Sequence, residues 1–168
     1  MSNEYLTRIA TNALRKHPCP GQPENWDPSE IQRVFRCNLE LSDPRISPQC
    51  KTLDYAGTFY LSGAQIGKCG YGVYRTDSRV SIHEFYPLLH ATQMQRHGIG
   101  TLAHASSVLA LNAECKGIGD YVVDHGIFIS GDLTRLLSKM GINPRGGLSF
   151  SEYARKSVQY ARSRGYKL

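Results

Sequence analysis

The chain has 168 residues, a formal net charge of +6 and 40% hydrophobic residues. This length fits one domain with its own core, spanning residues 1–168, and the composition is that of an ordinary globular protein. No apolar run approaches membrane-spanning length, and the first residues lack the pattern of a secretory signal, so we expect no membrane partner and a cytoplasmic location.

The cysteines and histidines lack the spacing of a metal site. The five cysteines are scattered without a C-x-x-C pair, at Cys19, Cys37, Cys50, Cys69 and Cys115. His97 and His104 are seven positions apart and could share a helix face, but no carboxylate or cysteine joins them at ligand spacing. We therefore expect free thiols in a reducing compartment and no bound metal.

The N-terminal part is expected to be helical. Residues 3–16 place apolar side chains on one face at helical spacing, and a proline-rich loop ends this helix. A second helix is expected to begin at Pro28. Its apolar positions at helical spacing are Ile31, Val34, Phe35 and Leu39. Both helices fall within residues 3–41, with no clear strand before them.

Three runs rich in aromatic and β-branched residues predict an antiparallel meander. They are Tyr55–Leu61, Gln65–Thr76 and Arg79–His90. Glycines in the middle run weaken a strand and indicate a bulge or a close backbone approach. These are Gly67, Gly70 and Gly72. Pro87 cannot donate to a ladder, so we expect the third strand to be bulged or splayed there.

A glycine turn then leads into a long helix, expected from Gly98 to about Glu114. The apolar spacing predicts a buried face made of Leu102, Ser106, Leu109 and Ala113. The segment Asp120–Asp124 is expected to be a short strand. A right-handed crossover would lay it parallel to the strand before Gln95.

The C-terminal part is expected to be mostly helical, with helices at Asp132–Met140 and Ser151–Arg164. Only Gly147–Phe150 could form a further short strand. This end of the chain is basic, with cations at Arg155, Lys156, Arg162, Arg164 and Lys167. Two interpretations remain open for them, a solvated helix face and a nucleic-acid contact.

The turn at residues 95–101 has features of a phosphate-binding loop. The first N–H groups of a helix have no partner within the helix, and the helix dipole adds positive potential at that end. Gly98 and Gly100 lack Cβ atoms, so an anion can approach the backbone closely. Arg96 and His97 add charge or hydrogen-bond donors. The alternative is a tight connection whose glycines serve packing only.

The order of elements resembles the GNAT superfamily of acyl-CoA-dependent N-acyltransferases. Three antiparallel strands, the turn, a long helix, a short strand and a short helix follow one another as in that family. Gln95, Gly98 and Gly100 fill the family's phosphate motif, [QR]-x-x-G-x-[GA]. The resemblance covers about residues 55–142.

A later family segment, N-x-x-A-x-x-F-Y-x-K-x-G-F, aligns with residues 130–142. Lys139 and Gly141 match the family's lysine and glycine. Ser130 replaces the asparagine and Leu137 replaces the tyrosine. The family's last two strands are also absent from the pattern, because the C-terminal segment reads as a helix.

The resemblance implies an α/β (α+β) fold with a mixed, mostly antiparallel twisted sheet flanked by helices. Two parallel strands would splay apart in a V, and acetyl-CoA or another acyl-CoA would lie in the cleft. The core would span residues 51–142, followed by a variant helical segment at 147–168. The residues implied to contact acyl-CoA are Leu88, Leu89, His90, Gln95, Arg96, His97, Gly98, Ile99, Gly100, Thr101 and Ser130.

The resemblance also implies direct attack of an acceptor amine on acyl-CoA in a ternary complex. An ammonium must lose a proton before it attacks, so a base is needed. Several family members use a glutamate in this strand, and Glu84, eleven residues before Gln95, is the first candidate. His90 is the second candidate if the strand alternation survives the bulge. His83 should point to the opposite sheet face from Glu84.

The general acid for the leaving thiolate is less defined, because Leu137 occupies the usual tyrosine position. Tyr86, Tyr121 or a water could protonate the thiolate, or it could leave unassisted. The helix residue His104 is expected to be half-buried rather than catalytic. Asp124 and His125 end the short strand and could contact acceptor or cofactor.

We thus predict acetyl transfer from acetyl-CoA to an amine. The acceptor, whether protein, small molecule or nucleic acid, is not identified by the sequence, and a homodimer is left open. One alternative is a catalytically degenerate GNAT-like binding or structural module, which Leu137 and the altered C-terminus favour. The other is a nucleic-acid-modifying or nucleic-acid-binding protein on the same fold, which the basic tail favours.

Overall fold

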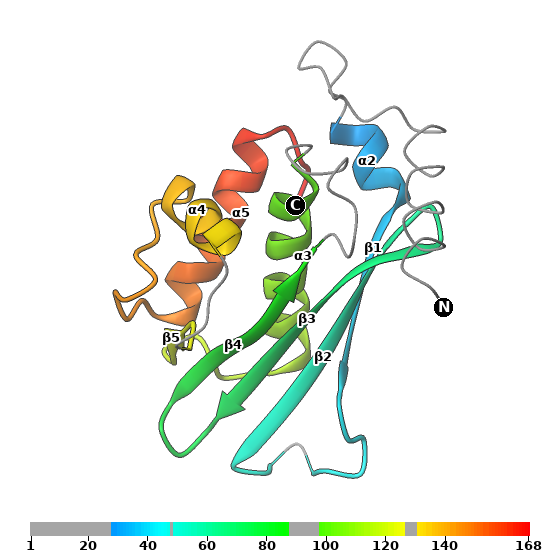
Figure 1. Cartoon of the computed structure of the whole chain (residues 1–168). Coiled ribbons are helices and arrows are strands. Elements are labelled where there is room, and N and C mark those ends of the chain that lie inside the picture. The colour runs from blue at the N-terminus through cyan, green and yellow to red at the C-terminus, as the bar shows by residue number, and fades with distance from the viewer. Residues whose placement is uncertain (1–27, 48, 88–97, 127–130) are drawn as a thin grey trace.

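The computed structural model describes residues 28–47, 49–87, 98–126 and 131–168, which form a mixed α/β fold (Figure 1). In chain order the elements are α2 (Pro28–Val34), β1 (Phe35–Leu41), β2 (Thr52–Leu61), β3 (Ala64–Tyr74), β4 (Arg79–Tyr86), α3 (Ile99–Glu114), β5 (Val122–Asp124), α4 (Gly131–Lys139) and α5 (Phe150–Ser163). The strands form one sheet in the order β1–β2–β3–β4–β5. No helix in the described ranges is long and apolar enough to span a bilayer. The helix expected at 3–16 lies outside these ranges.

The segment after α2 is a strand, so the helix expected to run to Leu39 is wrong beyond Val34. β1 pairs antiparallel with β2 over its whole length, from Phe35 opposite Leu61 to Leu41 opposite Tyr55. Phe35 and Leu39 are four positions apart, a spacing that suits one face of a helix and one face of a strand alike. Pairing with β2 selects the strand and buries both side chains.

The predicted meander of β2, β3 and β4 is confirmed, and so is the parallel addition of β5. β5 pairs with β4 only from Arg79–Val122 to Ser81–Asp124, and β4 then continues alone to Tyr86. The segment at Leu148–Phe150 also contacts β5. The N–H of Val123 donates to the Leu148 carbonyl at 2.9 Å, and Phe150 N–H donates to the Tyr121 carbonyl at 2.7 Å.

α3 is buried on more than one side, which corrects the single stripe expected from its sequence. Of the expected positions, Leu102 is buried but Ala113 is exposed. Ala105, Val108 and Leu111 are buried instead. The helix packs between the sheet and α5 (Figure 1), and α5 covers a side that a lone amphipathic helix would leave to solvent.

A β-bulge in β4 lies at His83. The register changes from Gly70 opposite Glu84 to Tyr71 opposite Ile82, so His83 is the extra residue. A bulge or a splay was expected at Pro87. The bulge lies instead four residues before it, and β4 ends one residue before the proline. The glycines of β3 explain the position. A Cβ at Gly72 would overlap the His83 ring, so the empty glycine face makes room for the extra side chain.

Gly67 is required by a close backbone approach. A Cβ at this position would overlap the Tyr86 carbonyl oxygen and lie 2.6 Å from the Pro87 carbonyl carbon. Backbone atoms cannot yield as a flexible side chain can. In the same strand, a Cβ at Gly70 would lie 3.5 Å from its nearest neighbour, Glu84 Cβ.

We therefore expect Gly67→Ala to lower the free energy of unfolding by about 3 kcal/mol, the cost of an overpacked site. Gly70→Ala is the matched control, and it should change this free energy by less than about 1 kcal/mol. Urea denaturation of the two variants measures both values. Equal losses at the two positions would show that the approach at Gly67 is not tight.

Candidate active site

The N-terminus of α3 begins at a glycine turn. Gly98 occupies the N-cap position with φ 70° and ψ 0°, a left-handed conformation that favours glycine. Within the described ranges, no side chain caps this end and the first turn contains no acidic residue. A Cβ at Gly100 would find Pro87 Cγ as its nearest described neighbour, at 3.6 Å. The first-turn N–H groups and the helix dipole therefore favour an anion here.

The C-terminal segment holds this turn in place. The buried Tyr166 donates its hydroxyl to the Gly98 carbonyl at 3.2 Å, and the N–H of Leu102 donates to the same oxygen at 3.2 Å. Gln32 exchanges two hydrogen bonds with the Lys167 backbone, at 2.7 and 2.8 Å, which ties the segment to α2. Sequence reasoning missed Tyr166, because no local pattern links it to a turn 68 positions earlier.

Two of the candidate catalytic residues, Glu84 and Tyr86, lie on one face of β4 beside Lys68 of β3. The Lys68 ammonium lies 2.5 Å from Glu84 Oε1 and 5.8 Å from the centroid of the Tyr86 ring. The Glu84 side chain is 34% exposed, and Tyr86 is 51% exposed. The carboxylate is thus held by an ion pair and is still reachable from solvent, where it could take a proton.

His83 lies on the same face as Glu84, which corrects the expectation of opposite faces. Gly70 and Gly72 share one face of β3. The Cβ direction of Gly70 meets the Glu84 side chain, and that of Gly72 meets the His83 ring. The bulge is the reason, since an extra residue interrupts the alternation of side chains. On this face His83 Nε2 lies 3.8 Å from Asp54 Oδ1.

A row of buried polar side chains connects α3, α5 and the end of β5. The Tyr153 hydroxyl lies 2.8 Å from His104 Nε2 and 3.1 Å from His125 Nε2. His125 Nδ1 lies 3.3 Å from the Pro144 carbonyl, which can only accept, so this nitrogen carries the proton. In the neutral ring, His125 Nε2 then accepts from Tyr153, whose oxygen accepts from His104 Nε2–H.

This assignment leaves a lone pair on His104 Nδ1, a buried atom without a partner among the described residues. Burial and, to a smaller extent, the nearby His125 together lower the pKa of His104 to about 3. Burial also lowers the pKa of His125, against the opposing effects of the Pro144 hydrogen bond and the Asp124 charge. Both rings are therefore neutral at pH 7. His104 is fully buried, not half-buried as expected, and the row joins elements of the core.

Several candidate residues lie outside the described ranges. They are Leu88, Leu89, His90, Gln95, Arg96, His97 and Ser130. The described turn residues Gly98, Ile99, Gly100 and Thr101 open α3 beside Pro87. Glu84 is three residues before that proline, which is about 10 Å along an extended strand. Asp124 forms an ion pair with Arg79 at 2.9 Å.

Three further features concern the chemistry available to the chain: the residue at position 137, the thiols and the possible metal ligands. Leu137, which the resemblance aligns with a tyrosine, is fully buried and carries no hydroxyl. The described cysteines are free, and burial raises the pKa of the Cys69 thiol well above its ordinary value and that of Cys37 to about 11. These two thiols are protonated at neutral pH and are poor nucleophiles. In the described part of the chain, no group of three His, Cys, Asp or Glu side chains could hold a metal ion.

Comparison of the chain with protein-family models, with curated proteins and with solved structures found no match.

Proposed function

We propose that this protein is an acyl-CoA-dependent N-acyltransferase that transfers an acetyl group from acetyl-CoA to an amine. The observation that carries the proposal is the glycine turn at the N-terminus of α3, where no described side chain caps the helix and the first turn contains no acidic residue. The order of the meander, α3 and the parallel strand β5 supports it, because the resemblance to GNAT enzymes implies this order. The short pairing of β4 with β5 fits the V-shaped splay.

The chain's own residues suit the parts of this reaction. The N–H groups of Ile99, Gly100 and Thr101 would hold the pyrophosphate, and Tyr166 would fix the turn by its bond to the Gly98 carbonyl. Acetyl-CoA supplies the activated acyl group. Glu84 would take the proton from the amine, with its carboxylate oriented by Lys68.

The test is acetyl-CoA binding by wild type, Gly100→Asp and Gly100→Asn. At a hundredfold excess over Kd, acetyl-CoA should raise the free energy of unfolding of wild type by about 2.7 kcal/mol. Gly100→Asp should lose this gain, because its carboxylate would repel the phosphates. The free Gly100→Asp protein should stay folded, since the new Cβ has room and a negative charge suits a helix N-terminus.

Gly100→Asn is the matched control, since it adds a side chain of the same size without the charge. It should keep most of the stabilisation by acetyl-CoA. Thermal or urea unfolding at several acetyl-CoA concentrations gives all three values. The proposal would fail if millimolar acetyl-CoA left wild type unchanged, or if the two variants lost the same amount.

A catalytically degenerate module is the second candidate, and Leu137 favours it because it carries no hydroxyl where GNAT enzymes have a tyrosine. Such a module would bind acetyl-CoA at the α3 turn without transferring the acyl group. Release of free CoA thiol in the presence of a panel of amines separates the two functions. Sustained acceptor-dependent release supports the enzyme, and tight binding without release supports the module.

A further inference from the structure

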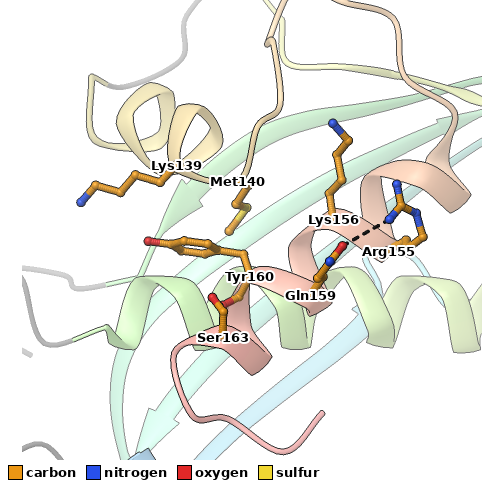
Figure 2. A pocket seen from close by; sticks show the side chains of 7 residues that line it. All are labelled: Lys139, Met140, Arg155, Lys156, Gln159, Tyr160 and Ser163. Carbon is orange, nitrogen blue, oxygen red and sulfur yellow. Dashed lines mark hydrogen bonds between the residues drawn. The ribbon is translucent and has the colours of Figure 1, made fainter.

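A polar groove lies between the C-terminal end of α4 and one side of α5 (Figure 2). Its volume is about 440 Å³, which lies within the range of sites for small organic ligands. The side chains that carry the argument are Lys139, Met140, Arg155, Lys156, Tyr160 and Ser163. None of the groove's lining residues belongs to the glycine turn or to β4, so the groove is separate from the candidate active site.

The groove has an excess of positive charge. Three cations line it, and no carboxylate does. Lys139 has no ion pair within the described ranges, and Lys156 donates to the neutral Gly141 carbonyl at 2.7 Å. Arg155 donates to Gln159 at 3.2 Å and lies 3.9 Å from Glu152 in an exposed pair, which offsets little charge. The positive potential in this concave site is therefore mostly uncompensated.

The shape of the groove favours an organic anion over a bare ion. Figure 2 shows Met140 and the Tyr160 ring side by side in the middle, with Lys139 on one side and Lys156 and Arg155 on the other. A thioether and an aromatic ring offer a surface for a planar apolar group. The Tyr160 hydroxyl adds a donor beside the cations, whereas the Ser163 hydroxyl already donates to the Tyr160 carbonyl at 2.7 Å. Phosphate oxygens can accept several such hydrogen bonds at once.

We propose that the groove between α4 and α5 is a second anion-binding site, which takes a phosphorylated ligand of nucleotide size. Three cations line one concave site of about 440 Å³, which favours a compact ligand over a nucleic-acid backbone. The site does not depend on the proposed acyltransferase function, because the two share no lining residue.

The experiment measures binding of inorganic pyrophosphate and of ADP to the full chain by calorimetry at physiological salt. Lys139→Gln and Lys156→Gln should each weaken binding about tenfold or more, because each removes a charge-assisted hydrogen bond. Lys116→Gln is the matched control, since Lys116 is exposed after α3 and does not line the groove. Its affinity should stay within about twofold of wild type. Thermal unfolding of each variant confirms that the fold is kept. Lys139→Gln removes no side-chain hydrogen bond or ion pair within the described ranges.

Four results would overturn the proposal. The first is that wild type binds neither probe at millimolar concentration. The second is that Lys116→Gln weakens binding as much as Lys139→Gln does. The third is that Gly100→Asp weakens ADP binding more than Lys139→Gln does, which would place the anion at the α3 turn. The fourth is that a single-stranded oligonucleotide binds through these lysines while ADP does not, which would make the groove part of a nucleic-acid surface.

Discussion

Replacing Glu84 by glutamine is expected to lower the rate of acetyl transfer by about 10²–10⁴, the usual effect of losing a general base. The glutamine fills the same space and can still accept a hydrogen bond from Lys68, but it cannot take the proton of an acceptor amine. The affinity for acetyl-CoA should stay nearly unchanged, because Glu84 does not belong to the glycine turn. Steady-state release of CoA thiol with an acceptor from the amine panel measures the rate.

Glu40→Gln is a matched control for this experiment. Glu40 and Glu84 lie in one row across the four strands β1 to β4, with Ala56 and Gly70 between them. Both glutamates therefore lie on one face of the sheet. Glu40 is exposed on β1 and should have no effect on the rate.

Two other substitutions decide which group is the base. His83→Gln and His90→Gln should each have smaller effects than Glu84→Gln. Near-full activity of Glu84→Gln together with a large loss in one histidine variant would assign the base to that histidine. His83 is included because the bulge places it on the same face as Glu84. If all three variants stay active, the protein acts by positioning and polarising the thioester without a base.

Acid is expected to destabilise the fold strongly through His104. The pKa of His104 lies near 3 in the folded chain, against an ordinary value of 6.5. Below pH 6.5 the unfolded chain therefore binds a proton that the folded chain does not bind, so stability falls as the pH falls. The loss is about 1.4 kcal/mol for each pH unit until the folded pKa is reached. His125, whose pKa is also lowered, acts in the same direction.

Urea denaturation between about pH 7 and pH 4.5 measures this loss, which should reach about 3 kcal/mol for His104 alone. His104→Gln cannot take up the proton, so its stability should fall less steeply than that of wild type over this interval. The difference between the two slopes should be about 1.4 kcal/mol per pH unit. The comparison uses the slopes and not the absolute stabilities, since the substitution also disturbs Tyr153. Equal slopes in wild type and variant would show that His104 is not buried as a neutral ring.

The sequence predicted well where one local pattern decides the structure. The meander follows from runs rich in aromatic and β-branched residues, and α5 follows from apolar residues at helical spacing. The close backbone approach expected from the β3 glycines is confirmed at Gly67, whereas at Gly72 the approaching atoms belong to the His83 and Tyr74 side chains.

The sequence predicted poorly where a distant element decides the structure. The spacing of Phe35 and Leu39 fits two periodicities, and only pairing with β2 selects the strand. Burial on a second side of α3 depends on α5. The bulge in β4 places His83 on the same face as Glu84, whereas strand alternation predicted opposite faces. The bond from Tyr166 to Gly98 joins the C-terminal segment to the candidate site, and no periodicity predicts such a contact.

The most direct measurement is an acetyl-CoA titration of the protein labelled with ¹⁵N, read at the backbone amides that open α3. If the turn holds the pyrophosphate, the amide resonances of Ile99, Gly100 and Thr101 should shift most among those of α3, with a saturating dependence on acetyl-CoA. The same titration of Gly100→Asp should leave these resonances in place. The account would be contradicted if acetyl-CoA left the first turn of α3 unchanged in wild type, or if the shifts appeared only elsewhere in the chain.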